Sequence, residues 1–158
     1  MKLRNFLCRS HLYNGLEQEL GRFYTQLLRL KARLAFARYL RQPGPHKLQI
    51  GAGPTKCAGW LVTDIDATLR SETAYLDATK RFPLPDASFD YVFSEHMIEH
   101  IPYPAACAML RECFRIMKPG ARIRIATPDL DRFLSLKTSA PNEVQSAYIA
   151  WVTKCILP

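Results

Sequence analysis

The chain of 158 residues is long enough for one domain, and its 48% hydrophobic content suffices for a packed core. No apolar run reaches the roughly 18 residues of a membrane span, and the first ten residues lack the apolar stretch and cleavage site of a secretory signal. The net charge of +8 belongs to residues 1–47, which contain ten Lys/Arg and two acidic residues. Residues 48–158 contain twelve Lys/Arg and twelve acidic residues and are neutral. Because this segment has no excess positive charge, we expect no nucleic-acid partner.

A long helix is predicted over residues 12–41. Its large apolar residues recur at spacings of three and four and form one stripe: Leu20, Phe23, Leu27, Leu30, Leu34 and Ala37. We expect this stripe to pack on the domain, with arginines in solvent and Pro43-Gly44-Pro45 ending the helix. The alternative is a basic amphipathic helix that binds a membrane surface or a partner. Lys31 and Arg38 argue against it, because they interrupt a wide apolar face.

The next segment reads as a strand over 47–50, a glycine turn, and a second strand over 60–64. Gly51 and Gly53 would let a cofactor approach the backbone closely, because they have no Cβ. A dinucleotide-binding turn needs a third glycine, a helix, and an acid about 20 residues on. Here Asp64 follows Gly53 by eleven residues, which leaves no room for a full helix. A cofactor with a ribose and no pyrophosphate therefore fits better than NAD(P) or FAD.

Two predicted strands end on carboxylates. Asp64 and Asp66 follow the strand over 60–64, and Asp77 closes a strand over 74–77. A carboxylate can accept hydrogen bonds from both hydroxyls of a ribose, and we prefer Asp64 to Asp66 for that role. Asp77 could receive an exocyclic amine. The bland alternative for each is a solvated turn.

A cluster of histidines and acids follows the predicted strand over 90–94. His96, Glu99 and His100 match the H-x-x-E-H pattern of inverted zinc peptidases. Pro102 and Pro104 leave room for only about one helical turn, so a zinc site is not favoured. In an open α/β sheet, ligands bind at the carboxyl ends of strands. His96 is therefore a candidate general base beside the cofactor, and some of these histidines could instead be structural.

The rest of the chain alternates in the same way. A helix is predicted over 104–118, with Lys118 in its last turn and Pro119-Gly120 ending it. A strand over 121–127 and helices over 129–137 and 142–156 follow. Strands that alternate with helices indicate a parallel sheet covered by helices. The five cysteines are scattered and form no CxxC pair. This favours reduced thiols in a cytoplasmic protein over disulfides or a zinc site.

Several motifs occur in order along residues 46–132: Leu48-Gln49-Ile50-Gly51-Ala52-Gly53, Gly59-Trp60, Asp64, Phe82-Pro83-Leu84-Pro85-Asp86, Ser88-Phe89-Asp90, Glu95-His96-x-x-Glu99-His100, Arg115-Ile116-Met117-Lys118-Pro119-Gly120 and Thr127-Pro128-Asp129-Leu130. This set resembles the class I S-adenosylmethionine-dependent methyltransferases, type 11-like, of bacterial polysaccharide and glycan clusters. The resemblance implies a Rossmann-like three-layer α/β sandwich with a mostly parallel sheet of about five strands in the order 3-2-1-4-5.

The resemblance also implies ten residues that bind S-adenosylmethionine. Those for the methionine part and methyl group are Gly51, Ala52, Gly53, Ser94, Glu95 and His96, and those for the ribose and adenine are Asp64, Ile65, Asp77 and Ala78. The implied acceptor is a small molecule or a glycan, and no metal is expected. Methyl transfer mainly requires proximity, and a base such as His96 is needed only for a hydroxyl acceptor.

The family sheet has seven strands and ends in an antiparallel hairpin, whereas only helices are predicted after residue 127. We therefore expect a basic helical extension over residues 1–44 and a truncated methyltransferase domain over residues 45–158. The alternative is a non-catalytic module that acts through its basic N-terminal helix. Peripheral association with a membrane would then use residues 12–41, since no integral membrane segment is expected.

Overall fold

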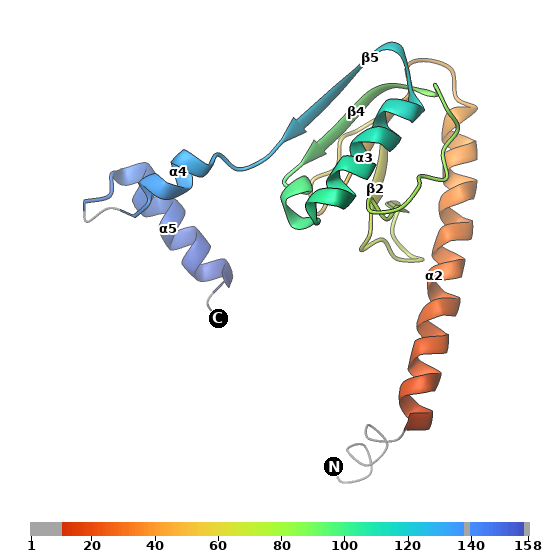
Figure 1. Ribbon diagram of the computed structural model, residues 1–158, viewed down its shortest axis with the longest axis horizontal. Helices are drawn as coiled ribbons and strands as arrows, with labels where there is room; N and C mark the ends of the chain where they lie inside the picture. Colours follow the sequence, from red (N-terminus) through yellow and green to blue (C-terminus); the bar gives the residue numbers. More distant parts are fainter. Residues whose placement is uncertain (1–10, 138–139, 157–158) are drawn as a thin grey trace. The chain divides into compact units, whose positions relative to one another are not determined.

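The computed structural model describes residues 11–137 and 140–156. The chain divides into two compact units, residues 1–125 and 126–158. The first unit holds a five-stranded sheet in the order β3-β2-β1-β4-β5 (Figure 1). Its strands are β1 (Lys47–Ile50), β2 (Leu61–Asp64), β3 (Ala74–Tyr75), β4 (Phe89–Glu95) and β5 (Met117–Ala126). The predicted strand order is confirmed, while the division at residues 44 and 45 stays a prediction.

The central strands pair in parallel. Leu48 lies opposite Leu61 on β2 and Val92 on β4, and Thr63 pairs with Ala74 on β3. Because parallel strands share one direction, the carboxyl ends of β1, β2 and β4 meet at the same edge of the sheet. The apolar runs that predicted these strands are buried, as expected of a parallel sheet.

Helix α3 (Tyr103–Ile116) packs on the sheet through Met109, Cys113 and Ile116, all about 1% exposed or less. Desolvation raises the pKa of the buried Cys113 thiol to about 12, so this cysteine is an inert core residue. Cys57 and Cys107 are also free thiols. Cys8 and the side chain of Cys155 lie outside the described residues.

The predicted end of α3 was wrong by two residues, because Met117 already adopts an extended conformation. The amides of Ala87 and Ser88 donate to the carbonyls of Arg115 and Ile116, which satisfies the end of the helix. Pro119-Gly120 therefore lies inside β5. A proline is tolerated there because β5 is an edge strand of the described sheet.

Lys118 also differs from its predicted role in the last turn of the helix. Its ammonium donates to Asp90 Oδ2 at 2.8 Å, and this hydrogen bond is the main cause of the lowered pKa of Asp90. The residue therefore connects β5 to β4 and has no part in the dipole of α3.

Helix α2 (His11–Leu40) lies beside β3 and extends past the sheet with its N-terminal half (Figure 1). The prediction that its leucine stripe packs on the domain is wrong, because Leu20, Leu30 and Leu34 are 59%, 57% and 66% exposed. The buried face is a second apolar set with a spacing of four: Leu28, Ala32 and Phe36. The small side chain of Ala32 lets the helix approach the sheet closely.

Lys31 fastens α2 to the connection between β2 and β3. Its ammonium donates hydrogen bonds to the carbonyls of Thr68 and Leu69, each at 3.1 Å, and to that of Ser71. Sequence analysis considered Lys31 only as an interruption of a wide apolar face, whereas the structure gives it a role in attaching the helix.

The second unit holds α4 (Leu130–Ser135) and α5 (Glu143–Ile156). Two helices were predicted here, and α4 is shorter than its predicted span of 129–137. Among the described residues, β5 is the last strand. In that same part of the chain, no helix combines the length and apolar character needed to cross a membrane.

An arginine inside the first unit holds the loop before β4 against α3. Arg115 donates to the carbonyls of Phe82 and Leu84 at 3.0 and 2.9 Å, and to Glu112 Oε2 at 2.6 Å. The same Glu112 oxygen accepts the amide of Phe82 at 2.9 Å. These charge-assisted bonds fix the segment that leads from β3 to β4.

Replacing Arg115 by methionine should lower the free energy of unfolding by about 2–3 kcal/mol, because Glu112 and two carbonyls lose their donor. Urea unfolding measures this change. Arg111→Met on the same helix is the matched control, since Arg111 is exposed and has no ion pair among the described residues. Equal losses in the two variants would contradict the role given to Arg115.

The same pair predicts a pH dependence. The hydrogen bond from Arg115 is the main cause that holds the pKa of Glu112 below its ordinary value. A carboxylate whose pKa is lower in the folded state than in the unfolded state stabilises the fold at pH values above its unfolded pKa of about 4.3. This stabilisation disappears as the pH falls through the folded-state pKa. Stability of the wild type should therefore fall from about pH 5 downwards, and Arg115→Met should fall less steeply over that range.

Candidate functional site

The turn after β1 depends on two glycines in the left-handed region. Gly51 has φ +63° and Gly53 has φ +52°. A Cβ on Gly51 would come within 2.8 Å of Met97 Cβ, and closer still to Met97 Cγ, so a side chain at position 51 would collide with a neighbour close to its backbone. A Cβ on Gly53 would meet nothing within 4 Å. The turn is therefore packed behind Gly51 and open in front of Gly53.

Asp64 connects this turn to the end of β2. Its Oδ2 accepts the amide of Gly53 at 2.7 Å, and its Oδ1 accepts the amide of Asp66 at 2.9 Å. The amide of Ala52 donates to the carbonyl of Thr63 at 3.1 Å and adds a second link. Each carboxylate oxygen keeps a further lone pair, so Asp64 can still accept hydroxyl donors.

Asp77 follows the end of β3 and is fixed in a similar way. Its Oδ1 accepts the amide of Thr79 at 2.9 Å and the Thr79 hydroxyl at 2.6 Å. The preceding residue, Leu76, donates its amide to the carbonyl of Asp64 at 3.1 Å. The two acidic strand ends are thus tied together by the backbone.

These strand ends surround a cavity of about 400 Å³, within the size range of small-ligand sites. Seven of the ten predicted residues line it: Gly51, Gly53, Asp64, Ile65, Asp77, Ala78 and His96. The lining also includes Asp66, and it contains no lysine or arginine. The cavity therefore presents carboxylates and offers no cationic side chain to a pyrophosphate.

Three of the predicted residues do not line the cavity. Ala52 is buried at 6% exposure, and Glu95 is exposed. Ser94 is fully buried, and its Oγ is the one buried side-chain polar atom of the described residues without a hydrogen-bond partner. An unpaired buried hydroxyl is unusual in a folded protein.

The lining residues that the sequence analysis did not name are Leu76, Thr79, Met97 and Ile101, and His100 was named only as part of the zinc-peptidase pattern. Met97 and Ile101 lie within and just after the histidine cluster, where the analysis considered only the polar residues. Their apolar side chains pack against the core. The alternation of apolar and polar residues in this loop was the sequence feature that could have predicted that Met97 and Ile101 point inward.

His96 has φ +49°, which is uncommon for a residue with a side chain. Its Nδ1 lies 3.3 Å from Glu99 Oε1, and its side chain is 61% exposed. The helical turn that follows is only η1 (Ile98–His100), as the prolines predicted. No group of three metal-ligating side chains is found among the described residues.

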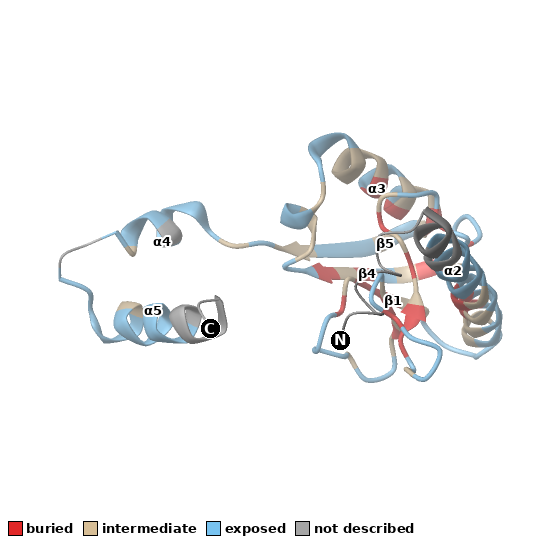
Figure 2. Cartoon of the chain, turned by 90° about the horizontal axis from the view of Figure 1, so that it is seen from below, coloured by how far each residue is buried: buried red, intermediate tan, exposed pale blue. Residues whose placement is uncertain are grey.

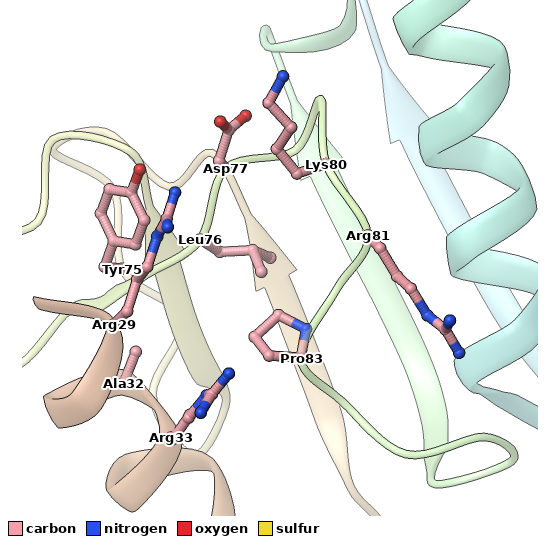
Figure 3. A pocket seen from close by; sticks show the side chains of 9 residues that line it. All are labelled: Arg29, Ala32, Arg33, Tyr75, Leu76, Asp77, Lys80, Arg81 and Pro83. Atoms are coloured by element: carbon pink, nitrogen blue, oxygen red, sulfur yellow. The ribbon is translucent and has the colours of Figure 1, made fainter. Parts of the chain in front are cut away.

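A second cavity of about 320 Å³ lies between α2 and the segment after β3 (Figure 3). It shares Leu76 and Asp77 with the first cavity, and Arg29 and Arg33 reach toward it from α2. Lys80 and Arg81 also line it. The cationic side chains of this region thus gather here, away from the glycine turn.

A family profile described as a methyltransferase domain matches residues 48–125. This range contains the glycine turn, both acidic strand ends and the cavity between them. Residues 48–125 form a class I S-adenosylmethionine-dependent methyltransferase domain. The strand order 3-2-1-4-5 agrees with this assignment, and S-adenosylmethionine is the cofactor of the family.

Known relatives of this methyltransferase are longer than the chain. An uncharacterised 37.1 kDa protein in a Streptomyces fradiae transposon is 30% identical over 139 residues, which are 73% of this chain and 39% of that protein. A Mycolicibacterium smegmatis protein named as an S-adenosylmethionine-dependent methyltransferase is 43% identical over 47 residues, 30% of this chain and 18% of that protein. The chain therefore spans less than half the length of either relative.

A solved structure with a similar fold comes from Methanococcus maripaludis and carries the name of an S-adenosyl-L-methionine-dependent methyltransferase. Its TM-score is 0.44 at 15% identity, over 90% of this chain and 70% of that chain.

Gly51→Ala should destabilise this methyltransferase more than Gly59→Ala. Both glycines have positive φ, +63° and +78°, but only at Gly51 does the new Cβ collide with a side chain. Backbone strain costs about 1–2 kcal/mol at either position, and overpacking adds about 1–3 kcal/mol at Gly51. Urea unfolding of the two variants gives the difference, and equal losses would contradict the packing described around Met97.

Proposed function

We propose that the chain binds S-adenosylmethionine in the cavity at the carboxyl ends of β1, β2 and β4 and transfers its methyl group to a small-molecule or glycan acceptor. The observation that carries the proposal is the Asp64 carboxylate, which holds the turn at Gly53 and faces the same cavity. This arrangement orders the glycine turn before any ligand binds. Preorganisation of this kind lowers the cost of binding.

The chemistry of the cavity lining fits the parts of this cofactor. We assign the ribose hydroxyls to Asp64, whose oxygens keep free lone pairs, with Ile65 beside the sugar. Asp77 and Ala78 would contact the adenine, and the glycine turn with Ala52 would contact the methionine part. The open space in front of Gly53 supports this assignment.

The charge of the cavity also favours this cofactor over a dinucleotide. S-adenosylmethionine carries a sulfonium and an ammonium against one carboxylate, so its net charge is positive. Asp64, Asp66 and Asp77 line the cavity without a lysine or arginine. They attract a cationic cofactor and repel the pyrophosphate of NAD or FAD.

When bound, the cofactor supplies an electrophilic methyl group for in-line attack by the acceptor. The main task of the protein is to hold the acceptor atom close to that methyl group. His96 is exposed at the rim of the cavity, where it could take the proton of a hydroxyl acceptor, and Glu99 orients its ring. The balanced charge of residues 48–158 supports an acceptor that is not a nucleic acid.

Isothermal titration calorimetry of the full chain tests the cofactor. S-adenosylmethionine and S-adenosylhomocysteine should both bind, and NAD should give no heat. Asp64→Asn should weaken binding at least tenfold, because an amide has only one acceptor oxygen for the turn and the ribose. Asp131→Asn on α4 is the control and should leave affinity unchanged. A folded wild type that binds neither compound would refute the proposal.

His96→Gln tests the role of the histidine. With a hydroxyl acceptor, the rate of methyl transfer from methyl-labelled cofactor should fall about 100-fold or more, because a base contributes roughly that much. Cofactor affinity should change far less than the rate. A variant that loses affinity and rate equally would assign His96 to cofactor binding alone.

A second proposal is a cofactor-binding module without transferase activity that acts through α2. The exposed leucine stripe of α2 favours it. Incubation of the full chain with labelled cofactor and a panel of phenols, sugars and amines separates the two proposals. Label transferred to any acceptor removes the second one.

A further inference from the structure

One face of α2 is exposed along most of the described helix (Figure 2). Several large apolar residues lie on this outward face. Leu20, Phe23, Leu30 and Leu34 are between 57% and 66% exposed, and Leu27 between them is half-buried. The buried face uses other positions of the same helix: Leu28, Ala32 and Phe36, of which Ala32 and Phe36 belong to the core cluster of the sheet. The helix therefore has two apolar faces, and the domain covers only one of them.

The spacing along the outward face is that of a coiled coil. Steps of three and four residues alternate without interruption, which assigns Leu20, Leu27 and Leu34 to heptad positions a and Phe23, Leu30 and Ala37 to positions d. In the sequence, Tyr13 and Leu16 extend the same repeat toward the N-terminus. Nearly four heptads in register are a specific pattern.

The stripe is too narrow for a lipid-binding face. A strict a and d repeat covers two positions in seven, whereas an interfacial helix needs a wider apolar surface. Arg22, Arg29 and Arg33 flank the stripe on one side. Lys31 on the other side is held by backbone carbonyls of the domain and is not available to a phosphate headgroup.

The flanking charges separate along the helix. Residues 17–26 contain two acids and one arginine, whereas residues 27–41 contain five Lys/Arg and no acid. In an antiparallel pair of helices, the acidic end of each helix meets the basic end of the other. Leu27 then lies opposite Leu30 of the second copy, and the sequence places Glu17 and Arg38 at heptad positions e, which face each other in this orientation. In a parallel pair, Arg33 would approach Arg38 of the second copy, which is repulsive.

We propose that two copies of this chain associate through the outward face of α2 as an antiparallel coiled coil. The packed face of α2 stays on its own sheet, because its residues occupy heptad positions b, c and f. The apolar stripe and the flanking charges of one α2 match those of a second α2 that runs in the opposite direction. A second copy of the chain can therefore cover the stripe without another protein. The proposal is independent of methyl transfer.

Sedimentation equilibrium of the full chain tests the association. The expected mass is twice 18.1 kDa. Leu30→Glu should weaken the dimer at least tenfold, because it places a charge at the centre of the seam. Leu110→Glu is the matched control, since Leu110 is an exposed leucine on α3, and this variant should remain dimeric. A monomeric wild type, including one that sediments with phosphatidylglycerol vesicles, would overturn the proposal.

A charge swap tests the orientation and does not depend on the stability of Leu30→Glu. Glu17→Arg and Arg38→Glu should each weaken the dimer, because each places like charges opposite one another. The double variant restores opposite charges across the antiparallel seam and should recover at least half of the lost association free energy. If the double variant instead lost as much association free energy as the two single variants together, the antiparallel arrangement would be overturned.

Discussion

The hydrogen bond from the Gly53 amide to the Asp64 carboxylate is the contact on which the proposed cofactor site depends. It closes the left-handed turn after β1 against the end of β2 without a helix between them. The other oxygen of Asp64 fixes the next turn through the amide of Asp66. One side chain thus shapes two adjacent loops while its remaining lone pairs face the cavity. The short interval between Gly53 and Asp64 makes this direct contact possible.

Charge is divided between two neighbouring cavities that share Asp77. The cavity at the glycine turn is lined by carboxylates without a lysine or arginine, and the cavity beside α2 is lined by Arg29, Arg33, Lys80 and Arg81. The segment after β3 separates these two environments. A cationic ligand and an anionic ligand are therefore directed to different sides of the same short segment.

Local patterns predicted the strands, the glycine turn and the acidic strand ends, because a buried parallel strand and a carboxylate at its end are visible in the sequence. The strand order and the remaining predicted lining residues were implied by the family resemblance. The end of α3 could not be predicted in this way. Pro119-Gly120 usually terminates a helix, but here tertiary hydrogen bonds from Ala87 and Ser88 end it earlier. The position of Ser94, buried behind the cavity lining, likewise depends on the register of β4 with β1.

The buried face of α2 was the main error, and its cause is physical. The helix has two periodic apolar sets, and the sequence analysis chose the one with the larger side chains. The sheet instead accepts Leu28, Ala32 and Phe36, where a small residue permits close packing. When a helix has one apolar face, the sequence predicts which face packs on the domain. When it has two, the choice depends on the surface against which the helix packs.

The attachment of α2 also bears on where this domain begins as a folding unit. Phe36 and Ala32 belong to the same core cluster as the strands, and the ammonium of Lys31 satisfies three carbonyls between β2 and β3. All three residues precede the segment 48–125 that defines the family. The segment matched by the family profile therefore omits part of the hydrophobic core, because α2 supplies Ala32 and Phe36 to it.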